Sequence, residues 1–141
     1  LYFDDKKRSM CILSATSIIK ILLPERQINK KIYNSFDLML NNLSSESWIN
    51  QYIYWELSLI KELGYEIDYS NSDESIQINE KSLRIPNLLL NKNINNDFNQ
   101  EIKKDLNFNK NLFIENFINP NRLSFPLFRN ILEDYFSWSA I

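Results

Sequence analysis

The sequence predicts a mainly α-helical domain, a helical bundle with a small β-hairpin element in its middle. Strand-favouring β-branched residues are scarce, because the 141 residues include no Val and one Thr. The long segments instead repeat apolar residues at the three- and four-residue spacing of a helix face. Apolar residues make up 44% of the chain, and its length is enough for a hydrophobic core. We therefore expect a single domain over residues 1–141, with a hairpin insertion at about 65–86.

Two helices are expected in the first part of the chain. The first spans Asp4 to Leu23 and ends before Pro24, whose ring disfavours helical backbone in the residue before it. Its apolar residues occupy more than one face, which predicts a buried helix. They are Cys11, Ile12, Ala15, Ile18, Ile19 and Leu22. The second helix runs from about Asn29 to Asn42. Its apolar stripe consists of Ile32, Phe36, Met39, Leu40 and Leu43.

A third helix is expected to be the central one. It begins at Trp48, after a run of serines that favours a helix start, and it carries apolar residues on two stripes. It closes at Gly64, the only glycine of the chain, which stands where a left-handed residue ends a helix. Beyond Gly64 the apolar pattern changes to the alternation of strands. Segments 76–78 and 83–85 alternate around the turn-like residues 79–82, and this pattern predicts the hairpin.

Three further helices are expected after the hairpin. A short one is marked by apolar residues at every fourth position from Phe98 to Leu106, and a second short one runs from Lys110 to Ile118. In the last helix Ser124 is expected to cap the N-terminus and Pro126 to occupy the first turn. Its broad apolar face consists of Leu127, Phe128, Ile131, Leu132, Tyr135 and Phe136.

The residue types exclude most catalytic and metal-binding motifs. The chain has no His, one Gly and one Cys, so it can form neither a glycine-rich phosphate loop, a His-based catalytic pair nor a four-ligand zinc site. We expect no metal and no cofactor. Cys11 has apolar neighbours, which predicts an inert core thiol, and the chain gives no sign of an oxidising compartment. Acid pairs such as Glu133 and Asp134 are expected to be solvated, so we expect no enzyme.

The chain shows no sign of membrane targeting. No apolar run approaches the roughly 18 residues of a membrane span, and the N-terminus lacks the order of a signal peptide. We expect a soluble, cytoplasmic protein. The first residues are Leu-Tyr-Phe rather than Met, which favours a fragment of a longer chain.

Charge is unevenly distributed along the chain. Residues 1–31 contain seven Lys and Arg against three Asp and Glu, whereas residues 32–82 contain two against nine. Ordinary solvated faces explain such an asymmetry. The alternative is a small basic patch that contacts a phosphate backbone. Its candidates are Lys6, Lys7, Arg8, Arg26, Lys30 and Lys31. Most aromatic residues lie on helix stripes, where packing in the core is the expected role rather than base stacking.

One acidic residue, Glu56, stands among apolar neighbours. The residues three, four and seven positions away on its helix are aromatic or aliphatic, so its carboxylate is expected inside the core. An unpaired charge there costs several kcal/mol, which favours a buried pair with an arginine over a catalytic acid. Arg129 is the first candidate because apolar residues flank it on its helix, and Arg26 is the alternative.

Two motifs remain to be explained. Residues 22–26 read LLPER, and after a helix residues 55–68 carry an aromatic-Glu pair and a Leu-Gly-Tyr ending. Residues 122–129 are expected to form the start of the last, Arg-bearing helix. These segments resemble the C-terminal region of the bacterial recombination and repair protein family RecO. The resemblance extends from about Leu22 to Tyr135.

This resemblance implies the helical part of a recombination mediator whose N-terminal OB-fold barrel would precede Leu1. Such a protein binds and anneals single-stranded DNA, at the nucleoid. With RecR and sometimes RecF, it helps to load recombinase onto strands coated by single-stranded-DNA-binding protein. The expected phosphate contacts are Arg26, Lys30 and Lys31. A generic helical adaptor without a DNA role is the alternative function.

Two features depart from the family pattern. Residues 70–73 lack the cysteines that form a zinc site in many relatives, so the zinc is not expected here. Ile53 and Tyr54 stand where some relatives carry basic residues that help to hold the acidic tail of single-stranded-DNA-binding protein. That part of the partner site is therefore not implied for this chain.

Overall fold

Five helices and a two-stranded hairpin make up the part of the chain that the computed structural model describes, residues 2–22, 30–65, 75–78, 81–86 and 98–137. The elements in chain order are α1 (Tyr2–Leu22), α2 (Lys30–Asn41), the 3-10 turn η1 (Asn42–Ser44), α3 (Trp48–Glu62), β1 (Ser75–Ile78), β2 (Lys81–Arg84), α4 (Phe98–Phe113), the π-helical turn η2 (Ile114–Ile118) and α5 (Leu127–Asp134). The mainly helical fold class with a small hairpin is confirmed.

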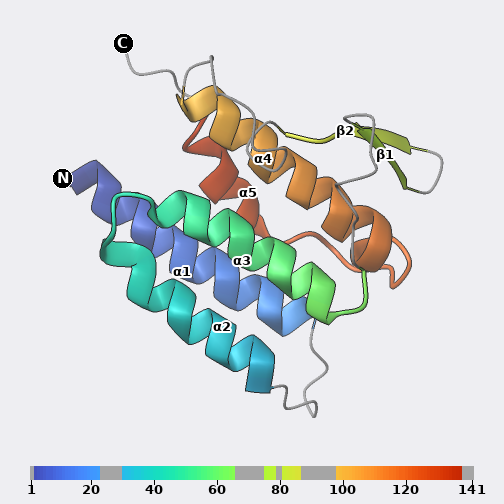
Figure 1. Ribbon diagram of the computed structural model, residues 1–141, viewed down its shortest axis with the longest axis horizontal. Helices are drawn as coiled ribbons and strands as arrows, with labels where there is room; N and C mark the ends of the chain where they lie inside the picture. Colours follow the sequence, from blue (N-terminus) through green and yellow to red (C-terminus); the bar gives the residue numbers. More distant parts are fainter. Residues whose placement is uncertain (1, 23–29, 66–74, 79–80, 87–97, 138–141) are drawn as a thin grey trace.

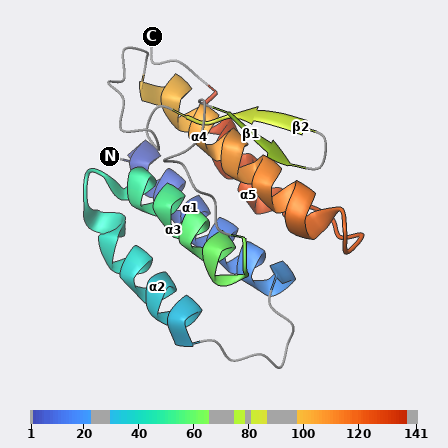
Figure 2. The ribbon, with the colours of Figure 1, turned by 45° about the vertical axis from the view of Figure 1, so that its right-hand side comes forward.

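The helix α3 lies at the centre of the bundle. It runs beside α1, with α2 on one side and with α4 and α5 on the other (Figures 1 and 2). Helix α3 packs against α2 and α4, while α1 packs against α5. Two stripes of α3 are buried, as its sequence predicts. The buried residues are Trp48, Ile49, Tyr52, Ile53, Trp55, Glu56, Leu59 and Ile60. None of the helices in the described ranges is long and apolar enough to cross a membrane.

Gly64 ends α3 in a hydrogen-bonded turn. Its φ angle is +102°, in the left-handed region that glycine adopts without a steric penalty. The Gly64 amide donates to the carbonyl of Lys61 at 2.9 Å, and the Tyr65 amide donates to the carbonyl of Ile60 at 3.1 Å. These two bonds form a Schellman motif, which satisfies carbonyls at the end of the helix.

The hairpin is a small element at the edge of the bundle, beside α4 (Figures 1 and 2). Its strands are antiparallel, with Ser75 opposite Arg84 and Ile78 opposite Lys81. Ile76, Ile78 and Leu83 are partly buried against the core. Their alternation with exposed residues is the pattern that predicts the hairpin.

The segment from Phe98 to Ile118 forms one continuous helical run, so the expectation of two short helices is wrong. No Gly or Pro stands between them to break the backbone. The asparagines in the middle are accommodated, because Asn111 Nδ2 donates to the carbonyl of Asn107 at 2.9 Å and Asn109 is hydrogen-bonded in the core. The run ends in the π-helical turn, where the Asn119 amide donates to the carbonyl of Ile114 at 2.9 Å.

The expected start and apolar face of the last helix also need correction. Pro126 is the N-cap residue with an extended ψ of 132°, and no side chain caps the helix, so Ser124 does not have the predicted role. Leu127 and Phe128 are 69% and 40% exposed rather than part of a buried face. The helix has eight residues and turns Arg129, Leu132 and Glu133 to the core. Hydrophobicity alone could not identify this face, because two of its three residues are charged.

Helix α1 is buried on one face rather than on several. Cys11, Ala15 and Ile18 are buried, whereas Ile12 is 40% exposed and Leu13 is 43% exposed. Helix α1 packs mainly against α5, and a helix that packs on one side leaves the other side open to solvent.

Candidate nucleic-acid interface and buried polar cluster

Arg129 and Glu56 form a bidentate ion pair inside the bundle. Arg129 Nε donates to Glu56 Oε2 at 2.6 Å, and Arg129 Nη2 donates to Glu56 Oε1 at 3.0 Å. Both side chains are completely buried. The structure thus brings together the two residues that the sequence pairs, one from α3 and one from α5. Arg26, the alternative partner, lies outside the described residues.

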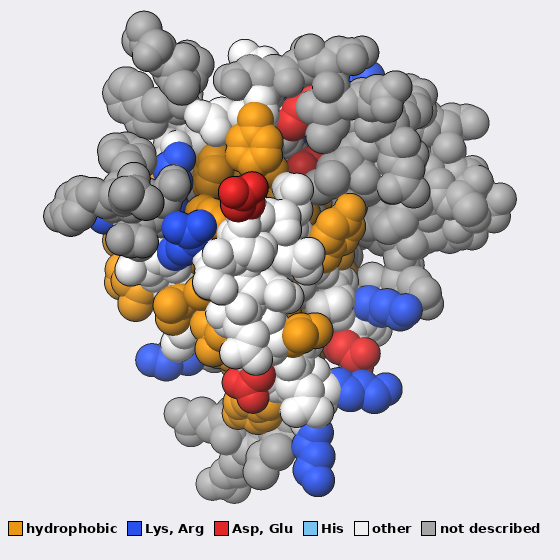
Figure 3. All heavy atoms as spheres, turned by 60° about the vertical axis from the view of Figure 1, so that its left-hand side comes forward, with side chains coloured by type: hydrophobic (Ala, Val, Ile, Leu, Met, Phe, Trp, Pro, Cys, Tyr) orange, Lys and Arg blue, Asp and Glu red, His pale blue; other side chains and the backbone are white. Residues whose placement is uncertain are grey.

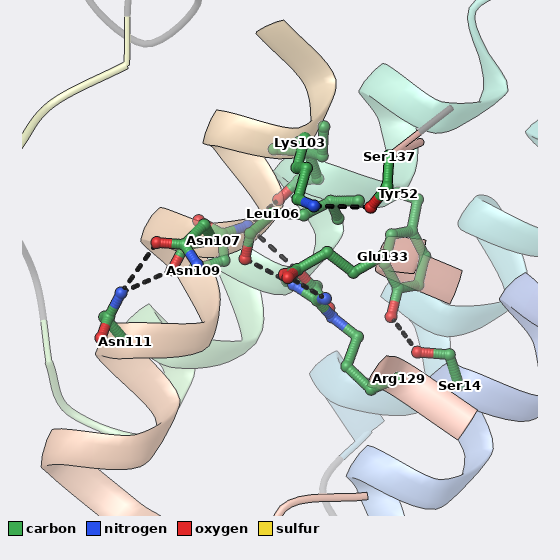
Figure 4. Close-up of polar contacts among 12 residues, drawn as sticks. Ser14, Tyr52, Lys103, Leu106, Asn107, Asn109, Asn111, Arg129, Glu133 and Ser137 are labelled. Carbon is green, nitrogen blue, oxygen red and sulfur yellow. Dashed lines mark hydrogen bonds and ion pairs between the residues drawn. The ribbon is translucent and has the colours of Figure 1, made fainter. Parts of the chain in front are cut away.

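Polar groups from three helices surround this pair (Figure 4). Arg129 Nη2 also donates to the carbonyl of Leu106 at 2.8 Å, and Nη1 donates to Glu133 Oε1 at 3.4 Å. Asn109 Nδ2 donates to Glu56 Oε1 at 3.1 Å and to a backbone carbonyl of α3 at 3.2 Å. The cluster therefore links α3, α4 and α5 and fixes their relative positions.

The expectation that Glu133 is solvated is wrong, because its side chain is buried. Its exposed fraction is 7%, because it stands four residues after Arg129 on the same face of α5 and turns toward the guanidinium. Asp134, the other member of the pair, is exposed. The two carboxylates therefore lie in different environments, one in the core and one at the surface.

The charges of the buried pair alter the proton affinity of the groups around it. Burial is the largest single influence and lowers the pKa of Arg129, but Glu56, Tyr52 and Glu133 together raise it by more, so the net shift is upward and the guanidinium stays charged. Burial and then the charge of Glu56 raise the pKa of Tyr52, whose hydroxyl shares a 2.7 Å hydrogen bond with Ser14 Oγ. Burial and then Glu56 also raise the pKa of Cys11, so its thiol stays protonated. This enclosed cluster holds the helices together.

Two further buried acids, neither of them expected from the sequence, lie on α4. Glu101 and Asp105 are each 1% exposed, one helical turn apart. Burial, and then the negative charge of Glu101, raise the pKa of Asp105 to about 7, while Lys104 opposes the shift. Neither carboxylate oxygen of Asp105 has a hydrogen-bond partner among the described residues. The available signal was helical spacing: Glu101 and Asp105 stand seven and three residues before Phe108, on the stripe that packs inward.

The basic residues of the first segment occupy two separate places. Lys30 and Lys31 are exposed at the start of α2. Lys7 and Arg8 lie near the start of α1, at the opposite end of the bundle (Figure 1). The 12 residues of α2 correspond to about 18 Å of helix, which separates the two pairs. The structure therefore does not join these cations into one patch, and Arg26 lies outside the described residues.

A groove of about 230 Å³ lies at the end of the bundle where α1, α3 and α4 begin. Its lining residues are Lys7, Arg8, Glu46, Trp48, Ile49, Phe98, Asn99 and Phe136. We name it the terminal groove. Figure 3 looks toward this end of the molecule and shows basic and hydrophobic side chains next to each other.

The cations of the terminal groove are held against aromatic rings. Lys7 Nζ lies 4.8 Å from the ring centroid of Phe136, and the Arg8 guanidinium carbon lies 5.7 Å from that of Trp48. Arg8 Nε also donates to the carbonyl of Leu43 at 2.6 Å, which ties α1 to the η1 turn. Such contacts fix the positive charge in place at the surface.

The described residues offer no candidate metal centre. Nowhere in those ranges do three His, Cys, Asp or Glu side chains come together closely enough to hold an ion. Cys11, the only cysteine, is enclosed in the core. The site that can meet a partner is therefore the surface, with its two basic regions.

The first half of the chain is similar to known proteins. Residues 4–72 match the family model for the C-terminal region of recombination protein O. The DNA repair protein RecO of Ehrlichia chaffeensis is 37% identical over 71 residues, that of Rickettsia bellii is 36% identical over 72, and that of Anaplasma marginale (strain Florida) is 34% identical over 70. Each alignment covers 49% of this chain and 29% of the relative. The chain thus spans less than a third of the length of these relatives over the matched part. No solved structure matches the chain.

The matched stretch differs in extent from the resemblance that the motifs predict. It begins at residue 4 rather than near Leu22, and it ends at residue 72, so the expected likeness of residues 122–129 lies outside it. It includes α1 from residue 4 onward, α2 and α3, with Glu56 and the Gly64 turn. Residues 4–72 of the chain are therefore similar to the C-terminal region of the RecO recombination proteins.

Proposed function

We propose that this chain is the helical part of a DNA repair protein that acts in homologous recombination. The observation that carries the proposal is the match of residues 4–72 to the RecO C-terminal family model, together with relatives that are named DNA repair protein RecO. The role is binding rather than catalysis. Its support is that the conspicuous cluster of charged side chains, around Arg129, is enclosed and serves to hold helices together.

The proposed activity of the whole protein is that of a recombination mediator of the RecFOR pathway. It binds single-stranded DNA, anneals complementary strands and helps to load recombinase onto strands coated by single-stranded-DNA-binding protein. Its partners are that protein, RecR and, in some systems, RecF. It works in the cytoplasm, on the nucleoid. An N-terminal OB-fold barrel supplies most of the affinity for the strand.

Within the chain, phosphate contacts are proposed at Arg26, Lys30 and Lys31. Lys30 and Lys31 are exposed at the first turn of α2. Two or three such contacts give weak binding with a shallow salt dependence, because log K for single strands falls by about 0.7 per neutralised phosphate for each tenfold rise in salt. We expect a slope of about −1.4 to −2.1 for the chain alone.

The test is a titration against a labelled single strand at several salt concentrations. The chain and a native protein that also contains the barrel are compared, each with and without RecR and single-stranded-DNA-binding protein. We expect weak strand binding by the chain, stronger binding and strand annealing by the longer protein, and a measurable contact of the helical part with at least one partner. A longer protein that binds neither strands nor partners contradicts the proposal.

A helical adaptor without a DNA role is the second candidate. What favours it is the separation of Lys30 and Lys31 from Lys7 and Arg8, because scattered cations are typical of a solvated surface. The terminal groove, which brings two cations together, favours the first candidate. In the titration, an adaptor binds RecR or another protein with no affinity for strands at any salt concentration.

A further inference from the structure

We infer that the terminal groove holds one nucleotide of a single strand, with a phosphate against Lys7 and Arg8 and the base against Phe98. The inference rests on the proposed function, because it gives the strand a second contact region beyond the start of α2. Three properties of the groove carry it: its size, the exposure of one of its rings and the sign of its charge.

The size of the groove fits one unit of a polymer. Pockets that enclose a small-molecule ligand have volumes of about 300–1,000 Å³. The groove offers about 230 Å³ and is open to solvent, so it suits one group of a longer molecule that lies across its mouth. Its lining combines cations, an amide and aromatic rings, which together match a phosphate and a base.

Phe98 is the ring in this lining that can stack on a base. Trp48 and Phe136 are 6% and 3% exposed, so they form the floor of the groove and support the two cations. Phe98, at the first position of α4, is 54% exposed. Stacking on an exposed aromatic ring beside a fixed cation is the usual way in which proteins hold unpaired bases.

The charge of the groove favours a phosphate. Lys7 and Arg8 face Glu46, so the formal charge of the lining is positive by one unit. Trp48 and Ile49 from the first turn of α3 also line the groove, and this turn carries no acidic residue that would offset the helix dipole. Arg8 is held in place by its bond to the η1 carbonyl, so little side-chain freedom is lost when an anion binds.

The experiment measures binding of fluorescein-labelled oligo-dT to the whole chain by anisotropy, at several salt concentrations. Phe98→Ala is expected to weaken binding by about fivefold or more, the effect of one lost base stack. Lys7→Gln is expected to weaken binding and to reduce the salt slope by about 0.7, the effect of one lost phosphate contact. Glu46→Gln is expected to tighten binding by about two- to fivefold, because a repulsive charge is removed. A gain in affinity cannot arise from partial unfolding.

Matched control variants make the same chemical changes at exposed positions outside the groove. Phe128→Ala on α5 removes an exposed ring, and Asp37→Asn on α2 removes a negative charge. Lys20→Gln removes a positive charge about 20 Å along α1 from Lys7. All three are expected to leave affinity within twofold of the parent chain.

The outcomes separate this inference from the proposed function. If the parent chain binds the strand and the groove variants behave like their controls, the groove assignment is wrong while strand binding stands. If the parent chain binds no strand at any salt concentration, strand binding by this chain and the groove assignment both fail. Oligo-glutamate is the comparison ligand. If the groove variants change only its binding, the groove takes an acidic peptide and the inference is overturned.

Discussion

Glu56 on α3 and Arg129 on α5 are 73 residues apart in the chain and share two hydrogen bonds inside the bundle. The same guanidinium reaches the carbonyl of Leu106 on α4. One side chain therefore fixes the relative position of three helices. Because the pair is fully buried, water does not stabilise either charge, and each charge depends on the other for its electrostatic stabilisation.

Removal of either partner is expected to destabilise the fold strongly. Glu56→Gln or Arg129→Met leaves one buried charge without its partner, and the expected loss is about 3–5 kcal/mol in the free energy of unfolding. Urea denaturation followed by circular dichroism measures it. The matched control is Glu62→Gln on the exposed end of α3, which should change stability by less than about 0.5 kcal/mol. A Glu56→Gln protein as stable as the parent would refute the structural role of the pair.

Asp105 is expected to make the fold less stable as pH rises from about 4 to about 7. Its pKa in the folded protein is about 7, against about 3.9 in an unfolded chain. Between these values the folded state binds the extra proton, so the free energy of unfolding falls as pH increases and levels off above pH 7. The size of the effect is at most about 4 kcal/mol.

Denaturation at several pH values tests this assignment. The chain has no His, so no imidazole titrates in the same range. Asp105→Asn is expected to stabilise the protein at neutral pH and to remove most of the pH dependence. Asp134→Asn, an exposed acid on α5, is the control and should preserve it. An unchanged pH profile in Asp105→Asn would show that this carboxyl is solvated.

Gly64 is expected to resist substitution although there is room for a side chain. A Cβ at this position meets nothing within 4 Å, so the cost of Gly64→Ala is conformational. A φ angle of +102° is unfavourable for any residue with a Cβ, and we expect a loss of about 1–2 kcal/mol in thermal or urea unfolding. A neutral Gly64→Ala would mean that the turn relaxes away from the left-handed region.

Arg122 offers the opposite change at an equivalent turn. Its φ angle is +54°, and the turn has the same pair of bonds: the Arg122 amide donates to Asn119 at 3.2 Å and the Leu123 amide donates to Ile118 at 2.9 Å. Arg122→Gly removes left-handed strain of about 1–2 kcal/mol and adds about 0.5–1 kcal/mol of chain entropy in the unfolded state. The net expectation is a gain of about 0.5–1 kcal/mol. A destabilised Arg122→Gly would show that the arginine side chain itself contributes to the fold.

The chain is expected to fold without a metal ion. One thiol, itself enclosed in the core, and no imidazole cannot supply the ligands of a structural zinc site. Elemental analysis of the purified protein should find no stoichiometric zinc, and a chelator should leave the melting temperature unchanged. Stoichiometric zinc would contradict this expectation.

The sequence by itself determined those features that depend on the local apolar pattern or on one residue with a strict structural requirement. The apolar stripes of α2 and α3 fix which faces are buried, because helical periodicity places those residues on one side. Gly64 marks the end of α3, because a left-handed turn strongly favours glycine. The partner of Glu56 could also be inferred, since a carboxylate among apolar neighbours requires a cation and Arg129 stands on an equally apolar face.

Only the tertiary structure decided which residues from different helices meet. Glu101 and Asp105 are charged, so the sequence predicts that they face solvent. The packing of α4 nevertheless buries both side chains. Leu127 and Phe128 are apolar, yet α5 turns its charged side to the core in order to place Arg129 beside Glu56. The terminal groove forms only because residues from the starts of three helices and the end of a fourth converge. The physical reason is that periodicity defines the faces of each helix, whereas the crossing of the helices determines which faces touch.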